Sequence, residues 1–151
     1  MKLITEPTEL QKKFLELQDD YSEYYWATAW AGVDSEAFEY LRTHEDKIKQ
    51  IVVGISFHHT DPEFIDKFLE NKLVKYDEQE NGIFHPKLFL FLNSDSDWKL
   101  LIGSANFTNS AFTKNTEATM LVTSEDDGAN KILLDTKKFI NAQWDKAGYF
   151  N

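Results

Sequence analysis

Hydrophobic positions repeat with two different periods along this chain, and the two periods predict helices and strands in turn. Residues 9–16 carry apolar side chains at helical spacing after a Pro7-Thr8 start, and residues 130–146 repeat that spacing near the end of the chain. Residues 51–57 form a short run of apolar and β-branched residues, which is typical of a strand buried on both faces. The pattern therefore indicates an α/β protein.

Cap and turn residues place the remaining elements between these segments. Asp34 and Ser35 predict the start of a helix that turns Phe38, Leu41 and Ile48 inward, and a second helix is expected from Pro62 to about residue 71. Strands are predicted at residues 24–31, 51–57, 73–76, 84–92, 98–103 and 116–123. No internal repeat or Gly/Ser/Pro linker interrupts the series, so residues 1–151 are expected to form a single domain. Its predicted fold is a three-layer α-β-α sandwich with a mixed central sheet.

Charge and composition narrow the function classes. The chain has 16 Lys and Arg and 26 Asp and Glu, a net charge of −10. Taken alone, this charge argues against a nucleic-acid binder, whose affinity normally rests on clustered Lys and Arg. A local basic groove can still coexist with acidic outer faces. The absence of cysteine excludes disulfides, thiolate metal sites and cysteine nucleophiles. No run approaches the roughly 20 apolar residues that cross a bilayer, so we expect no membrane partner and a cytoplasmic protein.

Three pairs of polar residues stand out in the second half of the chain. They are His85 and Lys87, Ser104 and Asn106, and Asn115 and Glu117. Residues two apart on a strand share a face, so each pair is expected to point the same way from the end of a strand. Burying an unpaired polar group costs about 1–3 kcal/mol, so such groups usually meet one another or a ligand. An imidazole, a cation, neutral hydrogen-bonding groups and a carboxylate together suit attack on a phosphodiester.

The strings that contain these pairs resemble a known family. His85-Pro86-Lys87 followed by Gly103-Ser104-Ala105-Asn106 resembles the His-x-Lys and Gly-Ser-x-Asn elements of the phospholipase D superfamily. Asn115-Thr116-Glu117 is similar to the branch that contains restriction endonucleases and helicase-associated nuclease domains. The resemblance implies a phospholipase D-like fold and a phosphodiesterase, most specifically a nuclease acting on DNA. It also implies catalysis with no metal and no cofactor, through a phosphohistidine.

The resemblance also implies roles for individual residues. His85 is the expected nucleophile, and Lys87 and Asn106 are expected to hold phosphoryl oxygens, with Ser104 and Asn115 binding substrate. The family pattern has an Asp five residues after its Lys, where this chain has Leu92. Glu117 is the expected substitute, placed against His85 to fix its tautomer and support the imidazolium; without that contact the domain would be impaired or purely binding. Family members use two His-x-Lys motifs and this chain has one, so a homodimer that shares one active site is expected.

Other interpretations remain open from the sequence. The domain could instead be a catalytically weak nucleic-acid-binding or interaction module, which Leu92 and the acidic charge favour, or a lipid phosphodiesterase. The adjacent His58 and His59 point to opposite faces of a strand, which disfavours a shared metal. An aromatic group could stack nucleobases, although core or dimer packing is its expected use: Tyr21, Tyr24, Tyr25, Trp26 and Trp30.

Overall fold

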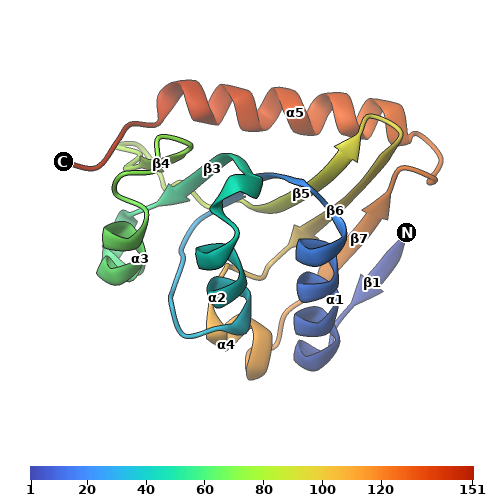
Figure 1. The fold of residues 1–151 in the computed structure, drawn as a ribbon, viewed down its shortest axis with the longest axis horizontal. Helices are drawn as coiled ribbons and strands as arrows, with labels where there is room; N and C mark the ends of the chain where they lie inside the picture. The colour runs from blue at the N-terminus through green and yellow to red at the C-terminus, as the bar shows by residue number, and fades with distance from the viewer.

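The computed structural model describes residues 1–151 and arranges them as one sheet between two layers of helices (Figure 1). The strands are β1 (Lys2–Ile4), β2 (Glu23–Thr28), β3 (Ile48–Gly54), β4 (Val74–Asp77), β5 (Lys87–Ser94), β6 (Asp97–Gly103) and β7 (Thr119–Thr123). The helices are α1 (Pro7–Asp20), α2 (Glu36–Thr43), α3 (Pro62–Lys67), α4 (Asn109–Thr113) and α5 (Ala129–Lys146), with short 3-10 turns at Glu45–Lys47 and Ser56–His58. The predicted α-β-α fold with a mixed sheet is confirmed.

The sheet runs in the order β1-β7-β6-β5-β2-β3-β4. Strands β2, β3 and β4 are parallel to one another, whereas every other neighbouring pair is antiparallel. Helices α1 to α4 cover one face, and α5 alone crosses the other face (Figure 1). The sheet is therefore buried on both sides, which explains the nearly continuous apolar sequence of its central strands.

Local sequence sets where the helices begin. Helix α1 starts at Pro7, which lacks the N–H that a first helical residue leaves unpaired anyway. Helix α2 starts after Ser35, whose hydroxyl accepts a hydrogen bond from Phe38 N at 3.0 Å, as the cap residue predicted. This helix ends at Thr43, so the prediction that Ile48 points inward from it was wrong. Ile48 is instead the buried first residue of β3, because the chain leaves the helical conformation at His44.

An aromatic core fixes the strands that carry the candidate site. A cluster of 27 buried residues fills the space between the sheet and helices α1 to α4, and a smaller cluster of nine lies under α5. Phe14 of α1 stands at the centre of the larger cluster, with its ring 5.1–5.6 Å from the rings of Trp26, Phe89, Phe91, Phe107 and Phe112. Four of these contacts are edge-to-face, a geometry that adds about 0.5–1.5 kcal/mol per pair beyond area burial, and the contact with Phe107 is tilted. They hold β2, β5 and the chain after β6 in one arrangement.

Strand pairing brings four strand ends to the same end of the sheet. Thr28, the last residue of β2, pairs with Lys87, the first residue of β5, and Gly103 at the end of β6 pairs with Thr119 at the start of β7. A Cβ on Gly103 would stand 2.2 Å from the carbonyl oxygen of Ala118, so only glycine permits this approach of β6 and the chain before β7. The polar residues singled out in the sequence lie at this end.

Candidate active site

The predicted polar residues flank the strands instead of lying within them, Lys87 excepted. Strand β5 begins at Lys87 and β7 at Thr119, so His85 and Glu117 belong to the preceding loops. Strand β6 ends at Gly103, which leaves Ser104 and Asn106 in the loop that follows. Alternation along a strand therefore does not explain how the side chains are oriented. Their contacts arise from the way the loops fold over the end of the sheet.

His85 and Lys87 are in direct contact. The Lys87 Nζ lies 2.7 Å from Nδ1 and 2.8 Å from Nε2 of His85, and 3.1 Å from the His85 carbonyl oxygen. The Lys87 side chain is buried, with 8 % of its surface exposed, whereas His85 is exposed to solvent. The indole of Trp30 and the imidazole form a T-shaped pair, with ring centroids 5.4 Å apart. The result is an accessible imidazole held against a buried ammonium group.

The environment shifts the pKa values of both groups. Partial desolvation and, after it, the charge of Lys87 lower the pKa of His85 below its ordinary value of 6.5. Burial likewise lowers the pKa of Lys87, and the negative charge of Glu117 acts in the opposite direction. A lowered histidine pKa keeps the ring neutral and nucleophilic at pH 7.

Glu117 is the centre of a small hydrogen-bonded network. Ser104 Oγ donates to Glu117 Oε1 at 2.6 Å, and Asn115 Nδ2 donates to Oε2 at 3.2 Å. Ser104 is fixed in turn by the backbone, because its Oγ accepts from Ala118 N at 2.9 Å and its N–H donates to the Ala118 carbonyl at 3.0 Å. Three of the six predicted residues thus form one unit.

Asn106 is held separately, by the chain that follows β2. Its Oδ1 accepts a hydrogen bond from the backbone N–H of Trp30 at 3.1 Å and lies 3.3 Å from Thr28 Oγ1. The Asn106 Nδ2 has no hydrogen-bond partner within the chain. An amide with its oxygen engaged and its nitrogen unengaged is oriented to donate to an acceptor from outside.

These three units meet around Lys87. Lys87 and Asn106 line the same small internal void of about 10 Å³, together with the buried Thr119. Glu117 reaches Lys87 through its charge, but no hydrogen bond joins Glu117 to His85. The structure thus brings all six predicted residues to one end of the sheet. The expected direct contact between the substitute carboxylate and the histidine is absent.

Leu92 lies too far away to influence this cluster. It is five residues along β5 from Lys87, which places it about 16 Å away. An odd separation also puts it on the opposite face of the sheet, and it packs in the core under α5 with Trp98 and Leu100. An aspartate at position 92 would therefore point away from the imidazole of the same chain.

Two residues near the site, Thr28 and Trp30, were not among the predicted catalytic and substrate-binding residues. Thr28 is buried, and its hydroxyl lies 3.0 Å from the Trp30 carbonyl and accepts from Phe107 N at 3.3 Å. Trp30 belonged to the aromatic group for which packing was the expected use, and the structure divides that group. Tyr24 and Trp26 are core residues, whereas Trp30 remains partly exposed beside His85. Only the pairing of β2 with β5 reveals this proximity.

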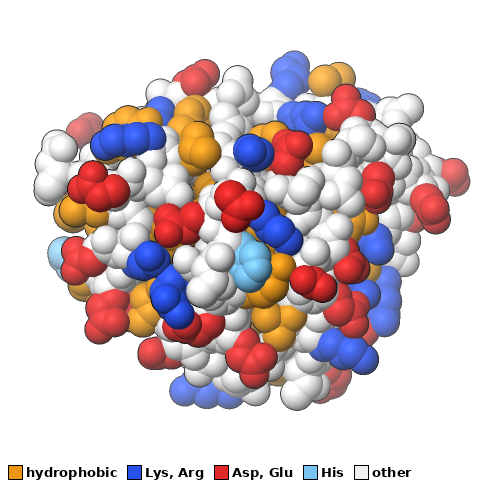
Figure 2. Space-filling model, viewed as in Figure 1, with side chains coloured by type: hydrophobic (Ala, Val, Ile, Leu, Met, Phe, Trp, Pro, Cys, Tyr) orange, Lys and Arg blue, Asp and Glu red, His pale blue; other side chains and the backbone are white.

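The surface charge is mixed. On the face in Figure 2, Asp and Glu are scattered over the whole surface, and Lys and Arg stand among them without merging into a continuous basic band. No group of three or more His, Cys, Asp or Glu side chains is arranged to hold a metal ion. None of the helices is both long enough and apolar enough to span a bilayer.

The chain matches one family model and is similar in fold to several solved structures. The family model described as "Cardiolipin synthase, PLD-like domain" matches residues 38–144, more than half of the chain. No curated protein matches the sequence of this chain. Among solved structures, the phospholipase D family member Nuc from Salmonella typhimurium superposes with a TM-score of 0.73 at 17 % identity, covering 99 % of this chain and 97 % of that one. NucT from Helicobacter pylori gives 0.67 at 20 % identity, covering 99 % and 98 %. At these identities the likeness concerns the fold.

Proposed function

Because the chain belongs to the phospholipase D-like family, we propose that it is a phosphodiesterase, most specifically a nuclease, that uses His85 as its nucleophile. The observation that carries the proposal is the contact between the exposed imidazole of His85 and the buried ammonium of Lys87, at 2.7–2.8 Å. A solvent-facing nucleophile beside a fixed cation is the arrangement that attack on an anionic phosphodiester requires.

In the proposed first step, a neutral ring nitrogen of His85 attacks phosphorus and forms a phosphohistidine while the leaving oxygen departs. The lowered pKa of His85 supports this role, because the lone pair is available at neutral pH. Lys87 and the unengaged Nδ2 of Asn106 would donate to the non-bridging oxygens, where negative charge builds up. Water then attacks phosphorus, and the P–N bond breaks to release the phosphate product and the free imidazole, while the group that protonated the leaving oxygen takes up the water proton.

Protonation of the leaving oxygen requires a second acid, and we propose that a second copy of the chain supplies it. His85 belongs to the only His-x-Lys sequence in this chain. The other histidines belong to no such sequence. His44 stacks on Tyr40 at the end of α2, and His59 packs against Trp30, the ring that also contacts His85. An exposed His85 could approach its counterpart across a two-fold axis, which supports a homodimer with one shared site.

Glu117 is proposed to support Lys87 instead of contacting His85. Its charge opposes the effect of burial on the pKa of Lys87, and its oxygens are fixed by Ser104 and Asn115. This assigns the network a positioning role: it keeps Lys87 charged and aligned. Ser104 and Asn115 would contact the substrate only at its periphery.

The decisive test is cleavage of labelled single- and double-stranded DNA with and without EDTA. Cleavage that persists in EDTA and is abolished in His85→Ala supports the histidine mechanism. An acid-labile, alkali-stable phosphate adduct trapped on His85 would support its intermediate. His44→Ala is a matched control, since it removes an imidazole from the end of α2, and it should retain wild-type activity.

Other outcomes distinguish the remaining functions. Binding without cleavage would favour a catalytically weak nucleic-acid-binding module, an alternative that the net charge of −10 still supports. Release of a headgroup from phospholipid vesicles, with no action on DNA, would identify a lipid phosphodiesterase. Light scattering tests the dimer, because a strict monomer with full activity contradicts the shared site. Fractionation of cells that express the protein tests the expected cytoplasmic location.

A further inference from the structure

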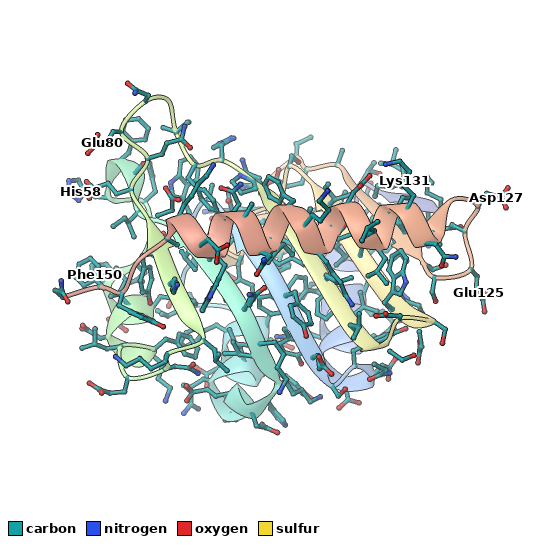
Figure 3. All side chains as sticks on the ribbon, turned by 90° about the horizontal axis from the view of Figure 1, so that it is seen from above. His58, Glu80, Glu125, Asp127, Lys131 and Phe150 are labelled. Atoms are coloured by element: carbon teal, nitrogen blue, oxygen red, sulfur yellow. The ribbon has the colours of Figure 1, made fainter.

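The turn after β3 holds an aromatic side chain in solvent in an unfavourable backbone conformation. Phe57 has φ 61° and ψ 17°, and His58 has φ 57°, so two consecutive non-glycine residues occupy the left-handed region. Residues with bulky side chains rarely adopt this conformation, and it persists where the surrounding structure imposes it. The Phe57 side chain is 67 % exposed. Figure 3 shows the neighbouring His58 projecting outward at the corner where the loop that bears Glu80 also stands.

Phe57 is the outer member of a row of rings that leads to the candidate active site. Its ring centroid lies 6.4 Å from that of His59, and the His59 ring lies 4.6 Å from that of Trp30. The Trp30 indole N–H donates to the Ser56 carbonyl at 3.2 Å, which fixes the ring against the same turn. We refer to Trp30, Phe57 and His59 as the aromatic ledge.

The ledge is continuous with the proposed catalytic pair. The Trp30 and His85 rings form a T-shaped pair with centroids 5.4 Å apart and an interplanar angle of 77°, and the Lys87 ammonium lies 5.8 Å from the Trp30 centroid. A phosphate at His85 and Lys87 would therefore have its attached nucleoside within reach of the ledge. His59 also lines a hollow of about 340 Å³.

The charges around this hollow indicate which part of a nucleotide suits it. Its ionisable lining comprises Asp34, Asp61 and Lys114 besides His59, so carboxylates outnumber ammonium groups. That balance disfavours a phosphate and is compatible with a sugar or a base. The phosphate is thus directed to Lys87, and the nucleoside to the ledge and the hollow beside it.

The net charge of the protein makes stacking more important. Proteins that bind nucleic acid through phosphate contacts draw their affinity from clustered Lys and Arg. In a chain with net charge −10, this electrostatic contribution to affinity is small. Stacking of bases on aromatic rings supplies affinity that does not depend on net charge. It requires bases whose faces are free, which duplex DNA does not offer.

Building on the proposed phosphodiesterase function, we infer that the aromatic ledge stacks an unpaired nucleobase next to the scissile phosphate, so that single-stranded nucleic acid is the substrate. Trp30 provides the fixed inner ring, and Phe57 provides the exposed outer one. The left-handed backbone at Phe57 is then the conformation that presents its ring to the base.

The test distinguishes the affinity contributed by the bases from that contributed by the phosphates. We would measure binding of an octathymidylate and of an abasic octamer with the same number of phosphates, on the full chain carrying His85→Asn so that neither is cut. The octathymidylate is expected to bind between about fivefold and about 150-fold more tightly than the abasic octamer. Phe57→Gly should reduce this ratio about fivefold or more, and Phe57→Trp should restore it.

Two controls make the result specific. Phe139→Ala removes an exposed phenylalanine from α5, on the other face of the sheet, and should leave the ratio unchanged. Phe57→Gly also relieves the left-handed conformation, so its melting temperature should not fall below that of the parent. A loss of base dependence in Phe57→Gly therefore cannot be attributed to unfolding.

Three results would overturn the inference. The first is an unchanged ratio in both Phe57→Gly and Trp30→Leu, and the second is duplex DNA bound as tightly as the octathymidylate. The third is conversion of a dimer into a monomer by Phe57→Gly, which would assign the exposed ring to the subunit interface. Failure of the catalytic proposal would look different: the wild-type chain would show no EDTA-resistant cleavage, but its base-dependent binding would remain.

Discussion

Replacing Thr28 with valine tests how the end of β2 supports the candidate active site. Valine has nearly the same shape, so the change removes one hydroxyl and preserves packing. That hydroxyl accepts the hydrogen bond of Phe107 N at 3.3 Å and lies 3.0 Å from the Trp30 carbonyl and 3.3 Å from Asn106 Oδ1. Phe107 is 1 % exposed, and its N–H has no other acceptor in the chain.

The expected loss of stability follows from that unpaired donor. A buried N–H left without an acceptor costs about 1–3 kcal/mol. For a chain of this size, each kcal/mol lowers the melting temperature by about 2–4 °C, so Thr28→Val should melt about 2–12 °C below wild type. Asn106 would keep its hydrogen bond from Trp30 N but lose the second contact that orients its amide. The DNA-cleaving kcat should therefore fall about tenfold or more.

Urea unfolding and cleavage kinetics on matched variants check both effects. Thr28→Ser keeps the hydroxyl and removes a buried methyl group, so it should lose about 1 kcal/mol yet retain kcat within about threefold. A free energy of unfolding of Thr28→Val within about 0.5 kcal/mol of the wild-type value, the scatter of a neutral surface change, would contradict the predicted loss of stability. A serine variant that loses as much activity as the valine variant would contradict the role of the hydroxyl.

Four further predictions concern the His85–Lys87 pair, Gly103 and Leu92. Lys87→Met removes a charge that lowers the pKa of His85, so the NMR titration of that ring should move upward; an unmoved or lowered titration contradicts the assigned cause. In the wild type, the neutral nucleophile is lost only as pH falls through the lowered pKa, so the acid limb of kcat/KM should lie below pH 6.5. Gly103→Ala would place a methyl group 2.2 Å from the Ala118 carbonyl oxygen, and thermal melting should show a loss of several kcal/mol; a stable variant would disprove the close approach. Leu92→Asp restores the family residue but buries a charge in the core under α5, so circular dichroism should show unfolding, and a folded variant with increased activity would refute this assignment.

The position of Leu92 changes the interpretation of catalytic competence. From the sequence, the missing aspartate favoured a weak interaction module, with Glu117 as its substitute beside His85. The structure places position 92 at the opposite end of β5 and on the other face of the sheet. Glu117 hydrogen-bonds Ser104 and Asn115 and acts on Lys87 through its charge. Leucine at position 92 thus supplies no argument against the proposed chemistry within this subunit.

The limits of sequence-based prediction are clearest in short and strained segments. Strand β1 spans three residues and α4 spans five, too few for a hydrophobic period to emerge, and neither was predicted. The helix expected to run to residue 71 ends at Lys67, and the strand expected to run to residue 57 ends at Gly54. Beyond Gly54 the chain enters the turn that contains Phe57, whose left-handed backbone no propensity would predict.

The sequence alone predicts the order of the main elements, the mixed α/β class and the strings that contain His85, Lys87 and Asn106. These features depend on residues a few positions apart, which periodicity and motif spacing record directly. How those strings come together depends on the tertiary fold. Asn106 binds the backbone of Trp30, 76 residues away, because β2 and β6 are separated in the sheet by β5 alone. The same order sets Trp30 beside His85, and it leaves Leu92 remote because a strand separates residues by length and by face.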